Sequence, residues 1–545
     1  MKMNSYTLSG NIVDLRAETI FKGRVSVENG IVTKIEKDDS VKEDHYILPG
    51  LVDAHIHIES SMMIPSEFAR LASVHGTVAT VSDPHEIANV LGIEGIDYMI
   101  ANGKKVPFKF YFGASSCVPA TPFETAGYEI GVQQLDTLLA RNDIKYMSEM
   151  MNFPGVINGD KQVLQKLEVA KKYGKPIDGH APGVKGEDAR KYIEAGITTD
   201  HECFTLEEAL EKINYGMKIQ IREGSAAKNF EALIDLMEDH ADKVLFCSDD
   251  RHPDDLEKGH INQLVIRAVN KGYDPVKVLK SAVLNPIDHY GLDVGTLQPG
   301  DPADMIVVDN LHNFHVLETY VNGILIARNG KTLISSVSET VPNNFHAQPI
   351  TLSDIRVNPQ EKKLKVMEAL DGQLITNVVY TEPKIEDGNV VSDPENDILK
   401  IVVLNRYNKA KPAVAFIKNF GLKHGAIASS VAHDSHNIVA TGTSDEEIVK
   451  AINLIVKEKG GVSLVDSTEE MIVPLPVAGL MSDRDGYSVA GMYHEIDKKA
   501  HALGSGLRAP FMTLSFMALL VIPELKLSDK GLFDGIRFSF TELFV

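Results

Sequence analysis

The pattern of apolar and polar positions changes near residue 47. Before it, the short alternating segments TLSGNIVDL, GRVSVENG and IVTKIEKD predict strands, and Asn29-Gly30 predicts a hairpin turn. From Ile47 onward, short β-type runs alternate with segments of helical period, such as residues 160–173, where Asp160 is placed to cap a helix. This alternation is typical of βα units around a parallel sheet.

The number of β-type runs makes the expected architecture more specific. Eight of them fall within about 200 residues, with helical segments between most of them, so we expect an α/β fold of the (β/α)8 barrel type. The predicted strands are residues 51–57, 77–83, 109–115, 144–149, 176–180, 197–202, 218–223 and 244–250.

The segments on either side of the barrel predict two further units. After the barrel, GTLQPGDPADMIVVDN and TYVNGILIARNG return to short strands, so we expect residues 1–46 with 295–335 to form a small composite β-domain. Residues 47–294 are the expected barrel. A polar stretch, SSVSETVPNNFHAQP, predicts a linker. Residues 350–545 are expected to form a separate C-terminal α/β domain.

The net charge and the cysteine content exclude several classes of function. The chain of 545 residues has 55 Lys and Arg against 76 Asp and Glu, a formal charge of −21. A surface this acidic repels phosphate backbones and anionic lipid. We therefore expect neither a nucleic-acid partner nor membrane attachment. Three widely spaced cysteines favour neither a disulfide framework nor a CxxC zinc site. With no apolar signal segment at the start, these features predict a soluble, cytoplasmic protein.

Chemically capable residues collect at the carboxyl ends of the predicted barrel strands, where barrel enzymes place their active sites. His55 and His57 are two apart, so both leave one face of an extended strand. Neutral imidazole and carboxylate are ligands for Zn, Mn or Fe(II), and four imidazoles with two carboxylates suit two ions better than one. The six candidate ligands are His55, His57, Glu149, His180, His201 and Asp249.

The sequence resembles a known family. PGLVDAHIHIESSMM, DPHEI, SEMMNFPGVI, DGHAPG, TDHE, REGSAA and CSDDRHPDDL are similar to segments of the adenine deaminases of the amidohydrolase superfamily. VAHDSHNIVATG, PLPVAGLMS and GLFDG extend the resemblance through the C-terminal region and are particular to the deaminase branch.

The resemblance implies hydrolysis of adenine to hypoxanthine and ammonia, as part of purine salvage. It also implies that two divalent ions, with Mn favoured over Fe or Zn, are held by the six candidate ligands, with Glu149 as the bridge. Many relatives use a carboxylated lysine instead, and Lys145 lies on the same strand. The two residues are four apart, about 13 Å along a strand. We choose Glu149, because it lies at the carboxyl end.

Catalysis also needs proton transfer. Asp249 is placed to take the proton of the attacking water. Candidates for a second acid are Asp83, His85 and Glu86 in SDPHE, and Glu202 beside a ligand. We assign Glu86 and Glu202 to catalysis, and Asp83 and His85 to substrate binding.

Two further groups of residues near the mouth leave alternatives open. Arg222 and Glu223 end strand seven, where they either contact the purine or form an ordinary ion pair. His433 and His436 in the C-terminal region are either solvated loop residues or groups that close over the barrel mouth.

Two other functions stay open at this point. Another binuclear amidohydrolase, acting on a cyclic amide or N-acyl substrate, would use the same ligands, and a metal-free protein of this fold would serve as a scaffold. A scaffold should lack several ligands, and this chain has all six. We therefore expect an enzyme acting on a small purine base, working as a homo-oligomer, in the first instance a dimer.

Overall fold

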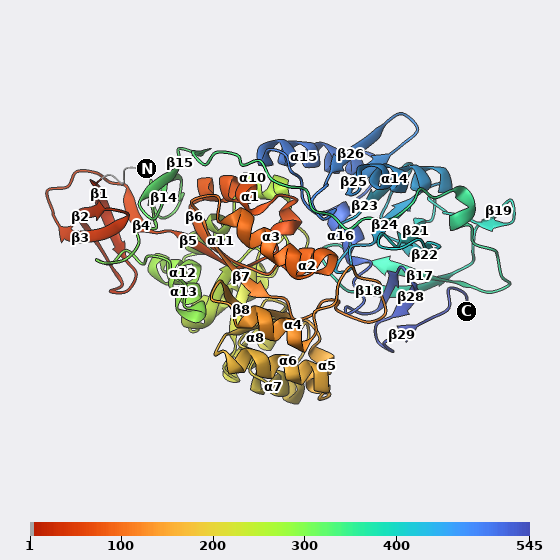
Figure 1. Ribbon diagram of the computed structural model, residues 1–545, viewed down its shortest axis with the longest axis horizontal. Helices are drawn as coiled ribbons and strands as arrows, with labels where there is room; N and C mark the ends of the chain where they lie inside the picture. Colours follow the sequence, from red (N-terminus) through yellow and green to blue (C-terminus); the bar gives the residue numbers. More distant parts are fainter. Residues whose placement is uncertain (1–4) are drawn as a thin grey trace.

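The barrel lies between two other sheets. The computed structural model describes residues 5–545 and places the N-terminal sheet at one end, the barrel in the middle and the C-terminal sheet at the other end (Figure 1). The barrel therefore has a neighbour on both sides, and only the C-terminal one contributes to the cavity described below.

The barrel is built from eight parallel strands, as the sequence predicted. Hydrogen bonds order them as β5-β6-β7-β8-β9 and β10-β11-β12. The backbone N–H of Thr198 donates to Ile177 O at 2.9 Å, and a bridge between Ile56 and Asp249 joins the last strand to the first. The strands are β5 (Leu51–Ile56), β6 (Thr77–Ser82), β7 (Lys109–Ala114), β8 (Ile144–Met150), β9 (Ile177–Gly179), β10 (Thr199–Asp200), β11 (Lys218–Arg222) and β12 (Val244–Cys247).

Helices follow the strands and cover the barrel. Asp160 caps α6 as expected, because its carboxylate accepts the backbone N–H groups of Gln162 and Val163 at 2.9 and 3.0 Å. The helices are α1 (Pro65–Ala72), α2 (His85–Leu91), α3 (Ile93–Gly103), α4 (Val132–Leu139), α5 (Phe153–Ile157), α6 (Lys161–Lys172), α7 (Gly186–Glu194), α8 (Leu206–Asn214), α9 (Phe230–Leu233), α10 (Pro253–Lys258), α11 (Ile261–Asn270), α12 (Pro275–Ala282) and α13 (Leu284–Tyr290).

The N-terminal sheet is formed by segments from both flanks of the barrel, in the order β16-β15-β14-β13-β4-β1-β2-β3. Asn29 and Gly30 have φ of 52° and 81° in the turn between β2 and β3, which is why this pair suits a tight hairpin. The strands are β1 (Tyr6–Asp14), β2 (Thr19–Glu28), β3 (Ile31–Lys37), β4 (Tyr46–Pro49), β13 (Met305–Val308), β14 (Val316–Val321), β15 (Ile324–Arg328) and β16 (Lys331–Thr332).

After a stretch without helix or strand over residues 333–351, the chain forms an eight-stranded sheet, ordered β18-β17-β22-β21-β24-β23-β25-β26. Two small sheets, β27-β28-β29 and β19-β20, accompany it. The elements are β17 (Leu364–Ala369), β18 (Thr376–Thr381), β19 (Ile385–Glu386), β20 (Asn389–Val390), β21 (Ile398–Leu404), β22 (Ala413–Lys418), β23 (Ala426–Ser429), β24 (Ile438–Gly442), α14 (Asp445–Glu458), β25 (Gly461–Val465), β26 (Glu470–Pro474), α15 (Gly486–Ala502), α16 (Pro510–Phe516), β27 (Leu525–Ser528), β28 (Gly531–Asp534) and β29 (Ser539–Phe540).

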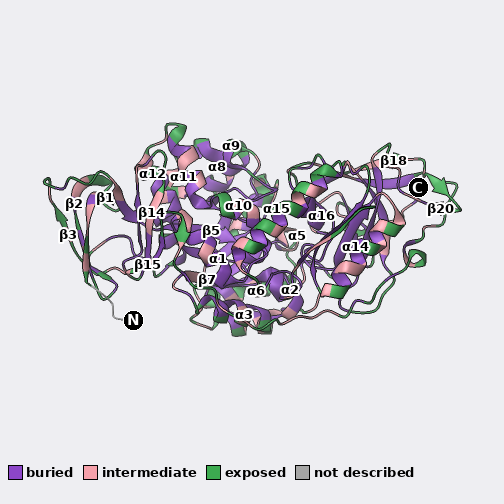
Figure 2. Cartoon of the chain, turned by 90° about the horizontal axis from the view of Figure 1, so that it is seen from above, coloured by how far each residue is buried: buried purple, intermediate pink, exposed green. Residues whose placement is uncertain are grey.

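The barrel and the C-terminal region share one apolar core. A single cluster of buried side chains includes Leu51 in the barrel and Leu527 in β27, and smaller clusters lie within the N-terminal sheet and the C-terminal region. Figure 2 shows this burial, with α14 exposing one face and burying the other. The shared core fixes the C-terminal region against the barrel. Within residues 5–545, no helix combines the length and apolar character needed to cross a bilayer.

Candidate active site and metal centre

The first group of donors lies where β5 meets the end of β12. His55 Nε2 is 3.2 Å from His57 Nε2, and Asp249 Oδ1 lies 3.6 and 3.3 Å from these two nitrogens. The backbone N–H of Asp249 donates to His55 O at 3.0 Å, and the N–H of His57 to Asp249 O at 3.4 Å. Strand pairing thus continues up to the donors and fixes their positions. All three residues are buried.

A second group is centred on Glu149, the penultimate residue of β8. Its Oε2 is 2.9 Å from His180 Nδ1 and 3.2 Å from His201 Nε2, while its Oε1 is 3.4 Å from His57 Nε2. One carboxylate therefore reaches both groups of donors. The structure brings together all six candidate ligands that the sequence nominated.

The spacing of these donors fits divalent metal ions. Donor atoms about 2.1 Å from one tetrahedral ion are separated by about 3.4 Å, which is close to the distances above. The electrostatics agree. Burial opposes a charge on His180, yet the carboxylates of Glu202 and Glu149 raise its pKa to about 9. The carboxylates thus favour a positive charge between the imidazoles, and a metal ion supplies one.

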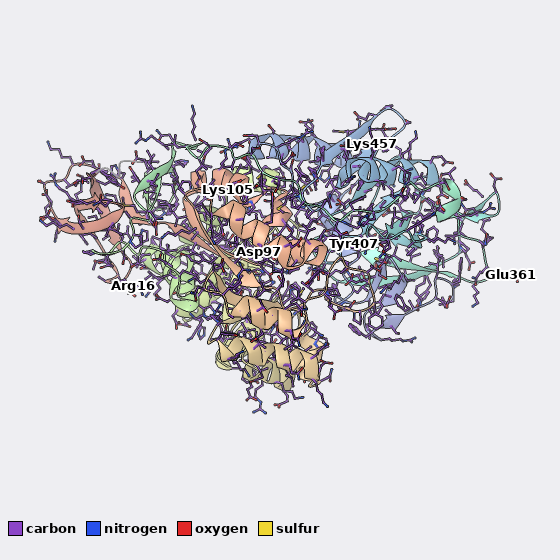
Figure 3. The ribbon with its side chains drawn as sticks, in the orientation of Figure 1. Arg16, Asp97, Lys105, Glu361, Tyr407 and Lys457 are labelled. Carbon is purple, nitrogen blue, oxygen red and sulfur yellow. The ribbon has the colours of Figure 1, made fainter. Side chains whose placement is uncertain are left out.

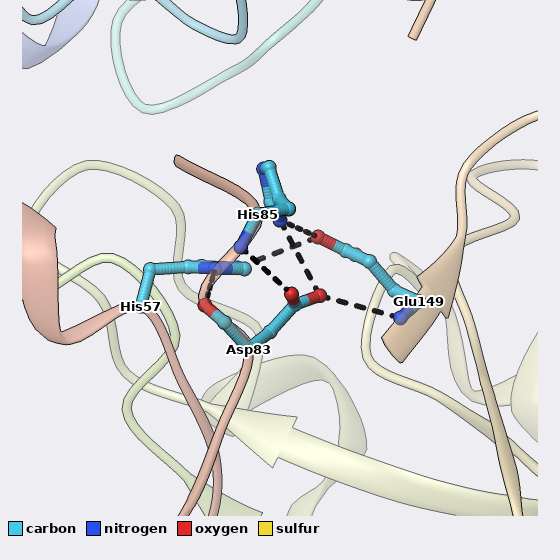
Figure 4. Close-up of side chains that lie close together, drawn as sticks. All are labelled: His57, Asp83, His85 and Glu149. Atoms are coloured by element: carbon cyan, nitrogen blue, oxygen red, sulfur yellow. Dashed lines mark hydrogen bonds and ion pairs between the residues drawn. The ribbon is translucent and has the colours of Figure 1, made fainter. Parts of the chain in front are cut away.

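Asp83, His85 and Glu149 form a connected set beside His57 (Figure 4). Pro84 caps α2, and Asp83 accepts the backbone N–H groups of His85 at 3.0 Å and Glu149 at 3.3 Å. His85 Nδ1 lies 3.3 Å from Asp83 Oδ2 and 3.5 Å from Glu149 Oε1. Asp83 therefore lies behind His85 and is not part of the cavity lining, whereas His85 is.

Arg222 is clamped between two carboxylates. Its Nη1 and Nη2 donate to the two oxygens of Glu202 at 2.5 and 2.8 Å, and Nη1 also donates to Asp249 Oδ2 at 2.6 Å. These three residues line the cavity, but their strongest contacts are with one another. The arrangement orients Asp249 and leaves little of Arg222 free to bind a substrate.

Glu223 and Lys145 lie away from this cavity, in contrast to the expectation for Glu223. Arg267 Nη1 is 2.5 Å from Glu223 Oε2, so Glu223 forms the ordinary ion pair that was its alternative reading. Successive residues of a strand point to opposite faces, which is why Glu223 turns away while Arg222 turns in. Lys145 lines a different cavity, with Lys109 and Asp293.

Glu86 is held by two histidines from the C-terminal region. Its Oε1 is 2.5 Å from His433 Nδ1, and its Oε2 contacts His436 Nε2. Although burial opposes ionisation of Glu86, His433 and His436 hold its pKa well below the usual range. The same loop brings Asp434 Oδ1 within 3.6 Å of His85 Nε2. The histidines of VAHDSHN are thus buried at the mouth of the barrel.

The side chains at the mouth of the barrel surround a small cavity of about 20 Å³. Its apolar part was not foreseen from the sequence. The side chains that sequence reasoning missed are Met151, Leu374, Asp434, Phe516 and Leu519. Asp434 was within reach, because it lies between the two histidines of VAHDSHN. The four apolar residues carry no signal that separates them from ordinary core positions.

Two family models match the chain. The amidohydrolase family matches residues 46–326, and the adenine deaminase C-terminal domain matches residues 373–539. The gap between the two matches, residues 327–372, contains the stretch without helix or strand over residues 333–351.

Curated proteins match over nearly the full length. The adenine deaminase of Salinibacter ruber is 54% identical over 99% of this chain and 99% of its own. That of Methanosarcina mazei is 53% identical over 98% of this chain and 99% of its own. That of a Sulfurovum species is 56% identical, again over 98% and 99%.

Solved structures cover about 60% of the chain. A β-aspartyl dipeptidase from Fervidobacterium islandicum covers 60% of this chain and 98% of its own, with 16% identity and a TM-score of 0.45. A D-hydantoinase from a Thermus species covers 60% and 96%, with 15% identity and the same TM-score of 0.45.

Proposed function

We propose, from the premise that this chain belongs to the adenine deaminase family of the amidohydrolases, that it hydrolyses adenine to hypoxanthine and ammonia. The observation that carries the proposal is the full-length match together with the six buried candidate donors, five of which line one cavity. No feature of the cavity favours a cyclic amide or N-acyl substrate, and a scaffold protein would have no use for this donor set.

As an amidohydrolase, the protein binds divalent metal. We propose two ions, with Mn favoured over Fe or Zn by the family. His55, His57 and Asp249 would hold one, and His180 with His201 the other, with Glu149 shared between them. When bound, such ions lower the pKa of water so that hydroxide forms near neutral pH. Lys145 is too far along β8 to replace Glu149.

We propose that Asp249 accepts the proton of the attacking water. Its Oδ1 faces His55 and His57, while its Oδ2 is fixed by Arg222, so the carboxylate is held in one orientation. Glu202 has both oxygens on Arg222. We therefore revise the role of Glu202 from a proton donor to a positioning partner of Arg222.

Two more protons must move: one to N1 as C6 becomes tetrahedral, and one to the amine as it leaves. We propose that His433, whose Nδ1 lies 2.5 Å from Glu86 Oε1, supplies the first, and that Asp249 passes the proton taken from water to the leaving amine. The proton of the C6 hydroxyl then returns to the Glu86–His433 pair. Burial opposes protonation of His433, but Glu86 raises its pKa to about 9. The pair therefore holds a proton at neutral pH that it can release to a substrate nitrogen.

The remaining lining supports a small planar substrate. His85, Asp250 and Asp434 offer polar contacts, and Leu374, Phe516 and Leu519 offer an apolar surface. A cavity so rich in carboxylates disfavours a phosphate, and its small volume of about 20 Å³ leaves little space for a ribose. We therefore propose that free adenine is the substrate, and that adenosine and AMP are poor ones.

The setting of the reaction is a further part of the proposal. The three cysteines are buried and free, and the net charge is −21, which supports a reducing, cytoplasmic compartment without a nucleic-acid partner. We also propose a homo-oligomer, in the first instance a dimer, to be tested by sedimentation.

The deciding experiment is ammonia release from adenine, adenosine, AMP and cytosine at equal concentration by metal-loaded protein. We expect turnover of adenine alone. Equal turnover of adenosine would contradict the closed cavity, and no turnover of adenine would contradict the proposed reaction.

A further inference from the structure

Lys526 in β27 is a buried lysine with no exposed surface. Its Nζ donates to the backbone oxygen of Leu374 at 2.6 Å and to that of Phe516 at 3.0 Å. Across residues 5–545, no carboxylate pairs with it, and burial alone lowers its pKa to about 7. Burying a cation without a counter-ion is costly, and an apolar residue of similar length would avoid that cost.

The two carbonyls that Lys526 holds belong to the apolar wall of the cavity. Leu374 and Phe516 both line it, and the N–H of Leu519, the third apolar residue contributed by the C-terminal region, donates to Phe516 O at 3.2 Å. The segments come from distant places, since Leu374 precedes β18 and Phe516 ends α16. One ammonium group therefore joins the two segments that form this wall.

The wall also touches the polar side of the cavity. The ring of Phe516 stacks on His433 with centroids 4.8 Å apart and an interplanar angle of 23°. His433 in turn contacts Glu86. A shift of Phe516 would thus change the surface that a planar base meets, while His433 keeps its own contact with Glu86.

We propose that Lys526 is a positioning residue that fixes Leu374, Phe516 and Leu519 as the surface on which the base packs. The proposal rests on the function proposed above. Packing against a flat apolar wall is equally available to substrate and transition state, so its loss raises KM more than it lowers kcat. A merely structural lysine would instead affect stability, and kcat and KM only in proportion to the folded fraction.

The test uses the full-length, metal-loaded enzyme with Lys526→Met, which keeps the length of the side chain and removes the charge and its donors. We expect KM for adenine to rise about tenfold or more, kcat to change by less than about threefold, and metal content to stay the same. The thermal midpoint should change little, because removal of an unpaired buried charge offsets the loss of the two hydrogen bonds to buried carbonyls. Lys457→Met is the matched control, since Lys457 is exposed on α14 of the same region (Figure 3).

Lys526→Gln provides a second reading, because its amide keeps a donor for one of the two carbonyls. We expect a KM between those of wild type and Lys526→Met. An unchanged KM in both variants overturns the proposal, as does a fall in thermal midpoint with KM unchanged. If Lys526→Met yields no folded protein, the KM of Lys526→Gln decides alone. Failure of the wild type to release ammonia from adenine would instead refute the proposed function.

Discussion

The cavity has two walls of different construction. The barrel supplies all the candidate metal donors, each at or just after the end of a parallel strand, such as His57 after β5 and Glu149 in β8. The C-terminal region supplies Leu374, His433, Asp434, Phe516 and Leu519, and only Phe516 lies within a helix or strand, at the last position of α16. The candidate metal donors are thus placed by the barrel sheet, whereas His433 and the apolar side chains that enclose the cavity lie mostly between elements.

The C-terminal wall needs its own supports because no sheet positions it. Two buried side chains that follow β21 hold the backbone of the loop that carries His433 and His436. Arg406 Nη1 donates to His436 O at 3.1 Å, and the Tyr407 hydroxyl donates to Ser435 O at 2.6 Å. Together with Lys526, these contacts replace the hydrogen-bond ladder that holds the barrel donors.

Removing the metal affects only the barrel wall of the cavity, and we expect it to lower activity more than any other change. We expect the chelated protein to lose all measurable ammonia release and to keep its far-UV circular dichroism, because the barrel core is packed without the ions. Activity should return on adding Mn. Undiminished turnover in metal-free buffer would contradict the metal centre.

Asp249→Asn replaces one carboxylate of the barrel wall by a neutral amide. It removes a proton acceptor and a donor to the metal, while Arg222 loses one of its two partners. We expect kcat to fall by about a thousandfold or more. Ammonia release and metal content are measured together. Near-normal values for both would show that Asp249 has neither role.

His433→Phe breaks the polar part of the C-terminal wall and keeps a ring to stack on Phe516. Glu86 loses its contact at Oε1, so we expect kcat to fall by about 10- to 100-fold with unchanged metal content. His424→Phe, at an exposed position of the same region, serves as the control. Equal activity of the two variants would show that His433 takes no part in proton transfer and that barrel residues carry it out.

The contrast between the two walls also explains how much of the fold and of the site could be predicted from the sequence. The eight strands and six donors followed from the sequence because a parallel barrel has a strict period and places strand ends on one rim. Glu223 was misplaced because a shift of one residue along a strand turns a side chain to the other face. The packing of Phe516 against His433 lay beyond sequence reasoning, since it joins loops from separate elements and has no period.

The smallest expected effect concerns the barrel scaffold away from both walls. His289 on α13 lies 3.2 Å from Thr198 Oγ1, and burial lowers its pKa to about 3. Since the unfolded chain binds a proton near pH 6.5, its stabilising contribution is present above that pH and is lost as the pH falls toward 3. Between pH 7 and 5 this amounts to roughly 1 to 2 kcal/mol.

We expect His289→Gln to lose less stability than wild type over this interval, measured as the shift of the urea midpoint at the two pH values. His315→Gln is the control, because the side chain of His315 is exposed. The difference between wild type and variant removes the contribution of the metal donors, which both share. Identical acid shifts in the two proteins would mean that His289 takes up its proton in the folded barrel as readily as in the unfolded chain.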